Sequence, residues 1–180
     1  MDAHGGVVIR DATEADFDRA GEVMVTAYRQ YDPVDSTDAA EREAWADYFV
    51  DIADVRSRLE SSRLIVAERD GDIVGAVTFY PRGGAHYEGD TVSWPDDWPS
   101  FRLLAVHPSA RGLRLGKALT EECMRRAREL GASVIALHTT VVMDVARAMY
   151  ERMGFVRVPE YDFYPIPGSD FVVMAYALKL

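Results

Sequence analysis

The chain contains a single cysteine, Cys123, among its 180 residues. One cysteine excludes an intrachain disulfide and favours a reducing compartment. No uncharged apolar run reaches the roughly 18 residues that a membrane-spanning helix needs. The first residues also lack a basic stretch followed by a long apolar one, so no signal peptide is expected. These absences predict a cytoplasmic protein that does not bind or cross a membrane.

Basic residues are also scarce relative to acidic ones. The chain has 20 Lys and Arg against 30 Asp and Glu, which gives a formal net charge of −10. A nucleic-acid-binding protein needs a broad basic face, so this balance disfavours that class. The 4 histidines and the single cysteine show no spacing typical of metal ligands, and no metal is expected.

What is present is ordinary globular composition, with 48% hydrophobic and 28% charged residues. The length suits one domain, and no repeat or low-complexity linker divides the chain. We therefore expect residues 1–180 to form a single domain with a sizeable buried core.

Apolar periodicity and turn residues predict an alternation of strands and helices. Strand 101–107, helix 115–130 and strand 134–139 form one βαβ unit, which requires a parallel strand pair with a right-handed crossover. The other connections favour antiparallel pairs, so we expect an α/β fold with a mixed, mostly antiparallel sheet and helices on both faces. The remaining expected strands are 7–13, 64–68, 73–80, 155–163 and 171–179, and the remaining expected helices are 13–30, 39–60 and 141–154.

A long irregular stretch, residues 81–99, separates two of these strands. It holds Trp94 and Trp98 on either side of Asp96 and Asp97. Aromatic rings beside carboxylates could hold a cationic or aromatic amine. A solvated loop anchored by two tryptophans explains the same residues equally well, and the sequence leaves both interpretations open.

The most informative stretch is "RGLRLGKA", residues 111–118, between an apolar strand and a helix. Glycines let a ligand approach the backbone, and free N–H groups at a helix start attract phosphate oxygens. A Walker A loop is excluded because Ala118 replaces its hydroxyl residue, and the glycine spacing does not fit a dinucleotide fingerprint. We interpret residues 111–118 as a pyrophosphate cradle built mainly from backbone.

Two sequence blocks, "LLAVHPSARGLRLGKAL" and "MDVARAMYERMGF", resemble the GNAT superfamily of acyl-CoA-dependent N-acyltransferases. The family signature is [RQ]-x-x-G-x-[GA]; the match here is Arg111, Gly112 and Gly116, whereas Arg114 stands where the family usually has glycine. The second block resembles a later helix of the family, with Met143 at a position that is often asparagine. Element order agrees over nearly the whole chain.

The resemblance implies acetyl-CoA, or another acyl-CoA, as the cofactor, held in a gap between strands 101–107 and 134–139. It also implies direct attack of an amine on the thioester, with Tyr150 as general acid for the departing thiolate and the N–H of Val106 as donor to the carbonyl oxygen. From the residues alone, Tyr150 would be a core aromatic. The cofactor-binding residues implied are Leu104, Ala105 and Val106 along the pantetheine arm, and Arg111, Gly112, Leu113, Arg114, Leu115, Gly116, Lys117 and Ala118 around the pyrophosphate.

The acceptor is expected to be a small-molecule or peptide amine, and the sequence leaves a homodimer open. The general base stays unassigned, as does the role of the aromatic segment 160–171, which could line the acceptor site or pack in a dimer. Two other functions are kept: a non-catalytic acyl-CoA-binding regulatory or sensor domain of the same fold, and a less favoured nucleotide-binding module. The open candidates for the base are Glu88, Asp96, Asp97, His138 and Asp162.

Overall fold

The structure is a computed structural model, and it describes residues 6–33, 37, 39–84, 93–165, 168 and 170–180. The chain forms two compact units, Met1–Thr78 with Leu103–Thr120 and Phe79–Arg102 with Glu121–Leu180. Three elements run from one unit into the other: strands β3 (Asp72–Tyr80) and β4 (Ser100–Val106) and helix α4 (Leu115–Glu129).

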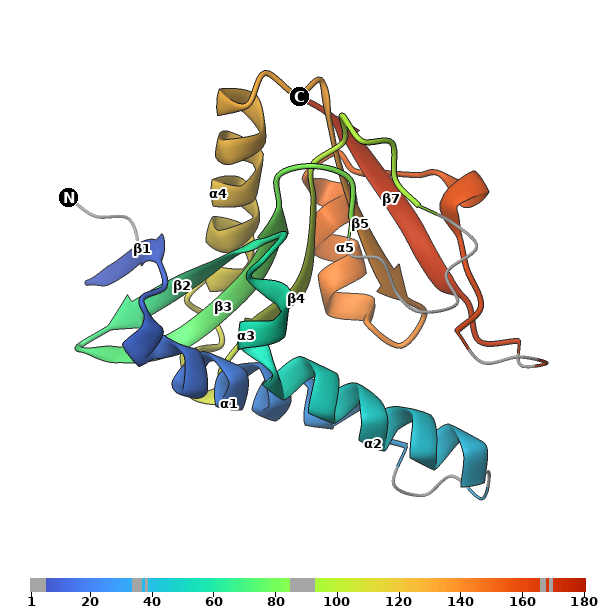
Figure 1. The fold of residues 1–180 in the computed structure, drawn as a ribbon, viewed down its shortest axis with the longest axis horizontal. Coiled ribbons are helices and arrows are strands. Elements are labelled where there is room, and N and C mark those ends of the chain that lie inside the picture. Colours follow the sequence, from blue (N-terminus) through green and yellow to red (C-terminus); the bar gives the residue numbers. More distant parts are fainter. Residues whose placement is uncertain (1–5, 34–36, 38, 85–92, 166–167, 169) are drawn as a thin grey trace. The chain divides into compact units, whose positions relative to one another are not determined.

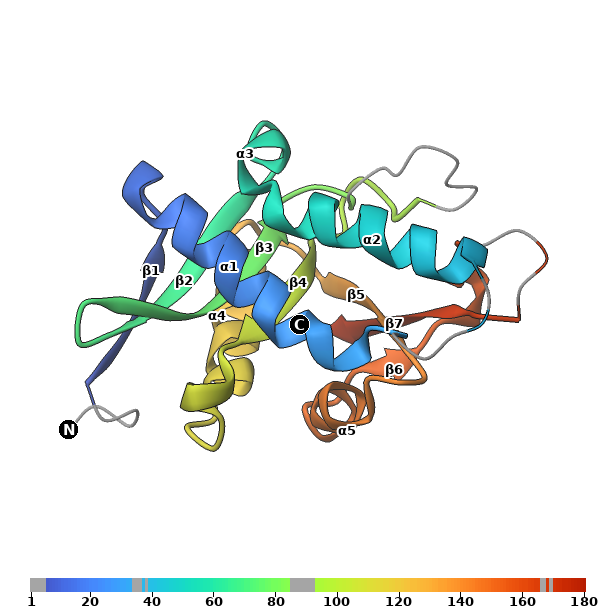
Figure 2. The same cartoon turned by 90° about the horizontal axis from the view of Figure 1, so that it is seen from below.

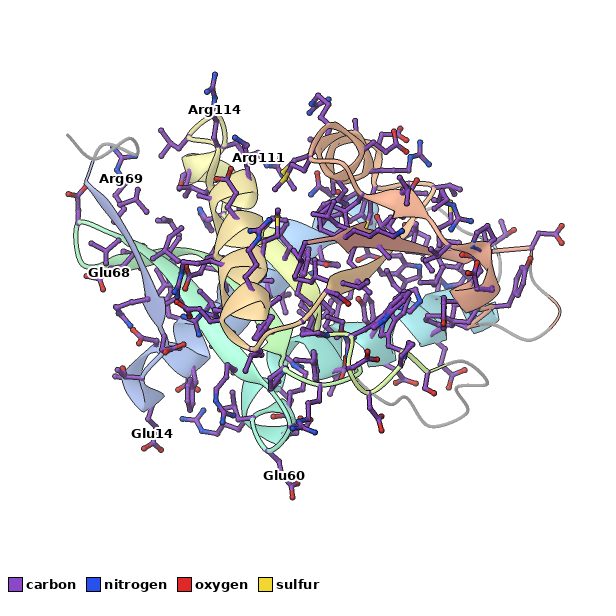
Figure 3. The ribbon with its side chains drawn as sticks, turned by 90° about the horizontal axis from the view of Figure 1, so that it is seen from above. Glu14, Glu60, Glu68, Arg69, Arg111 and Arg114 are labelled. Carbon is purple, nitrogen blue, oxygen red and sulfur yellow. The ribbon has the colours of Figure 1, made fainter. Side chains whose placement is uncertain are left out.

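The first unit contains strands β1 (Val7–Asp11) and β2 (Arg63–Arg69) and helices α1 (Phe17–Tyr28), α2 (Ala39–Ala53) and α3 (Val55–Arg58). Its strand order is β1-β2-β3-β4, with β1 antiparallel to β2. Figure 2 shows α1 in front of β1 to β3, and the opposite view in Figure 3 shows α4 in front of β2 and β3. Helices therefore cover both faces of this part of the sheet.

The core of the first unit is apolar and closed to water. Val23 and Met24 of α1, Ile65 of β2, Val77 of β3 and Leu119 of α4 are all fully buried. Each such side chain contributes roughly 1.5–3 kcal/mol through the surface it removes from water. The helical spacing of the apolar residues in α1 places them on the strands, as the sequence pattern predicts.

The second unit contains β5 (Val134–Thr140), α5 (Asp144–Arg152), β6 (Val156–Arg157) and β7 (Val173–Lys179), with strand order β4-β5-β7-β6. β4 and β5 are parallel, with Phe101 opposite Leu137, and β5 and β7 are antiparallel, with Ala136 opposite Ala177. Helix α5 lies beside β5 in Figure 1.

An indole covers the β5–β7 part of the sheet where a helix would usually lie. Trp94 is 7% exposed and packs on Ala136, Ala175 and Ala177, whose small side chains leave room for a large ring. Its ring stacks on His138 at 4.5 Å between centroids. The sheet face therefore contributes to a satellite core under the segment that follows β3.

The predicted fold class is confirmed: the sheet is mixed and mostly antiparallel, with one parallel pair. Two predicted elements were too long. The helix expected over 39–60 is broken at Asp54, whose side chain accepts a hydrogen bond from the N–H of Ser57 at 3.1 Å and caps α3. The strand expected over 155–163 is only β6, followed by a 3-10 turn at Pro159–Tyr161.

In the described part of the chain, no helix has the length and apolar character needed to span a bilayer.

Candidate cofactor site and acid

Strand β4 has an unusual backbone conformation at Leu103. Leu103 is 2% exposed, yet its φ is +54°, a left-handed conformation that few non-glycine residues adopt. Such a residue inside a strand is typical of a bulge, which twists the strand and re-aims the groups that follow it. The run "FRLLAV" carries no signal for this conformation, so the sequence analysis missed it.

Beyond Leu103, the backbone of β4 presents hydrogen-bonding groups at one edge. The N–H of His107 donates to the carbonyl oxygen of Val74 on β3 at 2.9 Å. Because backbone groups alternate in direction along a strand, the N–H groups of Val106 and Leu104 point to the edge opposite β3. These are two of the three residues that the sequence analysis assigned to the pantetheine arm.

The loop after β4 carries two residues in left-handed conformation. A 3-10 turn, Pro108–Ala110, ends at Arg111, and then Gly112 has φ +85° and Arg114 has φ +59°. Glycine adopts such a φ freely, whereas an arginine there is strained by roughly 1–2 kcal/mol. Arg114 stands where the resembled family has glycine, so the backbone conformation that suits glycine is kept here despite the substitution.

Helix α4 begins directly after this loop. The carbonyl oxygen of Arg114 accepts from the N–H of Ala118 at 3.1 Å, and buried Leu115 anchors the first turn. No acidic residue lies in that turn, so nothing in it opposes the positive end of the helix dipole.

The side chains add positive charge around this helix start. Arg111, Arg114 and Lys117 are exposed, and Figure 3 shows both arginines on the loop, with Arg114 extending away from it. A left-handed glycine, the N-terminus of a helix without acidic residues in its first turn, and three cations fit a pyrophosphate group.

Tyr150 lies in the second unit, on α5. It is 5% exposed, and its ring packs edge-on against Phe101 and Phe155 with centroids 6.0 Å and 5.8 Å away. The ring therefore also has the core role that the residues alone predict. Helix α5 begins at Asp144, and the N-cap residue before it, Met143, makes no side-chain capping hydrogen bond.

The candidates for a general base have different environments. Burial raises the pKa of Asp162, but hydrogen bonds from the Arg157 side chain and the Ala175 N–H outweigh it, and the pKa is lowered overall. A carboxylate with a lowered pKa is a poor base near neutral pH. Asp96 and Asp97 are exposed.

His138 is half-buried on β5. One ring nitrogen, Nε2, lies 2.9 Å from the carbonyl oxygen of Tyr161. A carbonyl only accepts, so Nε2 carries the proton in this contact. Glu88 lies outside the described residues.

Two further sequence expectations concern cysteine and metals. Cys123 is fully buried, and burial raises the pKa of its thiol far above the ordinary value, so it behaves as an inert core residue. In the ranges that the structure describes, no group of three or more His, Cys, Asp or Glu side chains is placed to hold a metal ion.

Comparison with known proteins agrees with this geometry. The sequence model of the Acetyltransferase (GNAT) family matches residues 23–155. The chain belongs to this family, whose members transfer acetyl groups from acetyl-CoA.

Similar proteins include the mycothiol acetyltransferase of Sanguibacter keddieii, 36% identical over 98 residues, and the human N-acetylaspartate synthetase, 32% identical over 103 residues. The matches cover 54% and 57% of this chain but only 29% and 30% of those proteins. The chain thus corresponds to less than a third of each relative.

Solved structures share the fold. A GNAT-family acetyltransferase from Staphylococcus aureus Mu50 superimposes with a TM-score of 0.67 at 17% identity, covering 97% of this chain and 99% of that one. The structure of yncA, a putative acetyltransferase from Salmonella typhimurium with its cofactor acetyl-CoA, gives 0.62 at 19% identity, covering 97% and 94%.

Proposed function

We propose that the chain is an N-acetyltransferase that transfers the acetyl group of acetyl-CoA to a primary amine by direct attack in a ternary complex. The observation that carries this proposal is the conformation of the loop before α4. Gly112 and Arg114 are both left-handed, and they lead into a helix start that has no acidic residue in its first turn. Membership of the acetyltransferase family supports the same reading.

The pyrophosphate cradle (residues 111–118) holds the pyrophosphate in this proposal. Backbone N–H groups at the start of α4 donate hydrogen bonds to phosphate oxygens. The side chains of Arg111, Arg114 and Lys117 add positive charge, and dissolved salt weakens this part of the attraction. Leu104 and Val106, on either side of Ala105, form backbone hydrogen bonds along the pantetheine arm, in the manner of an added strand. The direction of the Val106 N–H, away from β3, supports this role.

Acetyl-CoA supplies the acyl group as a thioester. The Val106 N–H donates a hydrogen bond to the carbonyl oxygen, on which charge builds as the amine attacks. Tyr150 donates its hydroxyl proton to the leaving sulfur. The amine must be neutral to attack, and a base or a water chain from a carboxylate such as Asp96 or Asp97 would accept its proton.

The Tyr150 assignment is tested by Tyr150→Phe. We expect turnover to fall at least a hundredfold, since general acid catalysis contributes roughly 10²–10⁴-fold. The Kd for acetyl-CoA, measured by calorimetry, should stay within twofold because the ring packing is kept. Phe155→Leu is the matched control, since it alters the same aromatic packing without removing a hydroxyl. Unchanged turnover in Tyr150→Phe would contradict the acid role.

One observation favours a second candidate function, a non-catalytic acyl-CoA sensor. Met143 stands at the start of α5 where the family often has asparagine, and it makes no capping hydrogen bond. A sensor would bind acetyl-CoA without releasing thiol in the presence of any amine. A nucleotide-binding module would instead show competition by ATP or NAD.

A further inference from the structure

The end of β5 carries two adjacent buried hydroxyl groups. Thr139 is 3% exposed and Thr140 is 8% exposed. Among the residues that the structure describes, neither Oγ1 atom has a hydrogen-bond partner. A buried hydroxyl without a partner lowers stability, and valine would fill nearly the same space without that penalty. A hydrogen-bond acceptor on a ligand would satisfy such a hydroxyl, and which of the two it reaches depends on the face of the strand.

The two hydroxyls lie on opposite faces of β5, because successive side chains alternate along a strand. Thr140 shares its face with Ala136 and His138, the face covered by Trp94. Thr139 shares its face with Leu137, which pairs with Phe101 of β4. Phe101 packs on Tyr150 of α5, so Thr139 lies on the Tyr150 side of the strand.

The chain is open to solvent directly beyond this pair. Thr140 accepts a hydrogen bond through its carbonyl oxygen from the N–H of Met143 at 3.2 Å, which closes a turn before α5. Val141 and Val142 within this turn are each 48% exposed. The Thr139 hydroxyl is therefore two residues from an exposed turn that leads to a helix without a side-chain cap.

We propose that the Thr139 hydroxyl is a positioning group for the acyl-CoA, donating a hydrogen bond to a carbonyl oxygen of its acyl-pantetheine arm. This inference rests on the proposed function, since Tyr150 on the same face is the assigned acid for the thiol end of that arm. Thr140, on the other face, takes no part in holding the arm. The acceptor oxygen belongs either to an amide carbonyl of the arm or to the thioester carbonyl. Free CoA carries the amide carbonyls but not the thioester carbonyl.

The test compares Thr139→Val, Thr139→Ser and Thr140→Val with the unmodified protein. Binding of acetyl-CoA and of free CoA is measured by calorimetry, and thermal unfolding is measured without ligand. Thr139→Val should raise the Kd about fivefold, as expected for one lost neutral hydrogen bond. It should melt no lower than the unmodified protein, because it removes an unsatisfied hydroxyl. Thr139→Ser, which keeps the hydroxyl, and the matched control Thr140→Val should both bind within twofold.

The ligands separate the two oxygens. Weaker binding of both ligands assigns the amide carbonyl, and weaker binding of acetyl-CoA alone assigns the thioester carbonyl. Unchanged Kd values in Thr139→Val would overturn the inference while leaving the proposed function standing. An equal loss in Thr140→Val would also overturn it, since the effect would then belong to the strand end as a whole. If the unmodified protein binds neither ligand, the proposed function fails and the inference fails with it.

Discussion

The left-handed conformation of Arg114 predicts the sign of a stability difference between two substitutions at this position. Arg114 has φ +59°, and Arg111, three residues earlier, has φ −62°. In Arg114→Ala, the Cβ atom keeps the steric conflict of the left-handed conformation, which costs roughly 1–2 kcal/mol. In Arg114→Gly, that conflict is removed because glycine has no Cβ atom. Glycine loses about 0.5–1 kcal/mol more chain entropy on folding. Arg114→Gly should therefore be more stable than Arg114→Ala by about 0.5–1 kcal/mol.

At Arg111 the order of stability of the two variants should reverse. Neither alanine nor glycine is strained at this φ, so only the larger loss of chain entropy of glycine distinguishes them. Arg111→Gly should be less stable than Arg111→Ala by about 0.5–1 kcal/mol. For a chain of 180 residues these differences correspond to about 2 °C in Tm. Comparing glycine with alanine at each site cancels the loss of the arginine side chain. The assay is urea unfolding of the four variants, and the same sign at both positions would refute the reasoning.

Two further predictions concern packing and charge. Gly84→Ala would place a Cβ atom 2.4 Å from Cδ1 of Trp94, so we expect a loss of about 1–3 kcal/mol in urea unfolding, partly recovered by adding Trp94→Phe. No recovery would show that the overlap is not with the indole. Hydrogen bonds from Arg10, at 2.7 and 3.0 Å, hold the pKa of Asp16 well below its ordinary value. The stability that this pair provides is fully present above the unfolded-state pKa of about 3.9 and is lost as pH falls through the lower folded-state pKa. Asp16→Asn should flatten the fall in unfolding free energy between about pH 5 and pH 2, and an unchanged slope would contradict the ion-pair account.

Local signals in the sequence predicted most of the elements. The hairpin β2–β3 turns at Asp70 and Gly71, which have φ +53° and +84°, as an Asp-Gly turn between apolar runs predicts. The helix before Gly131 and the parallel strand pair followed from the same kind of pattern. The turn and the helix end depend on residues close together in the chain, and the parallel pair follows from the order of neighbouring elements.

The features that escaped prediction depend on distant residues. Leu103 lies in an ordinary apolar run, and only its surroundings in the folded sheet hold it at φ +54°. The choice between an anchoring and a ligand-binding role for Trp94 needed the positions of Ala136 and His138, more than 40 residues away; their packing shows the indole as an anchor. The unpartnered hydroxyl of Thr139 could not be distinguished from an ordinary strand threonine by sequence.

The cradle and the acid differ in how far sequence reasoning could reach. Glycine spacing and basic residues predicted a pyrophosphate cradle at residues 111–118, which stays a prediction, and the left-handed φ at Arg114 explains why glycine is usual there. The acid role of Tyr150 rested on the family resemblance, because a tyrosine on an apolar helix face is equally typical of a buried core residue. Its packing on Phe101 is consistent with the acid role and with the core role.

The central claim is tested most directly by thiol release from acetyl-CoA across a panel of primary amines. The panel should include amino acids, polyamines, aromatic amines and peptides with free N-termini, with Tyr150→Phe measured beside the unmodified protein. The account predicts that at least one amine triggers thiol release, with the amine acetylated in equal amount, and that Tyr150→Phe loses most of this activity. Tight binding of acetyl-CoA with no thiol release for any amine would contradict it and support a sensor in place of an enzyme.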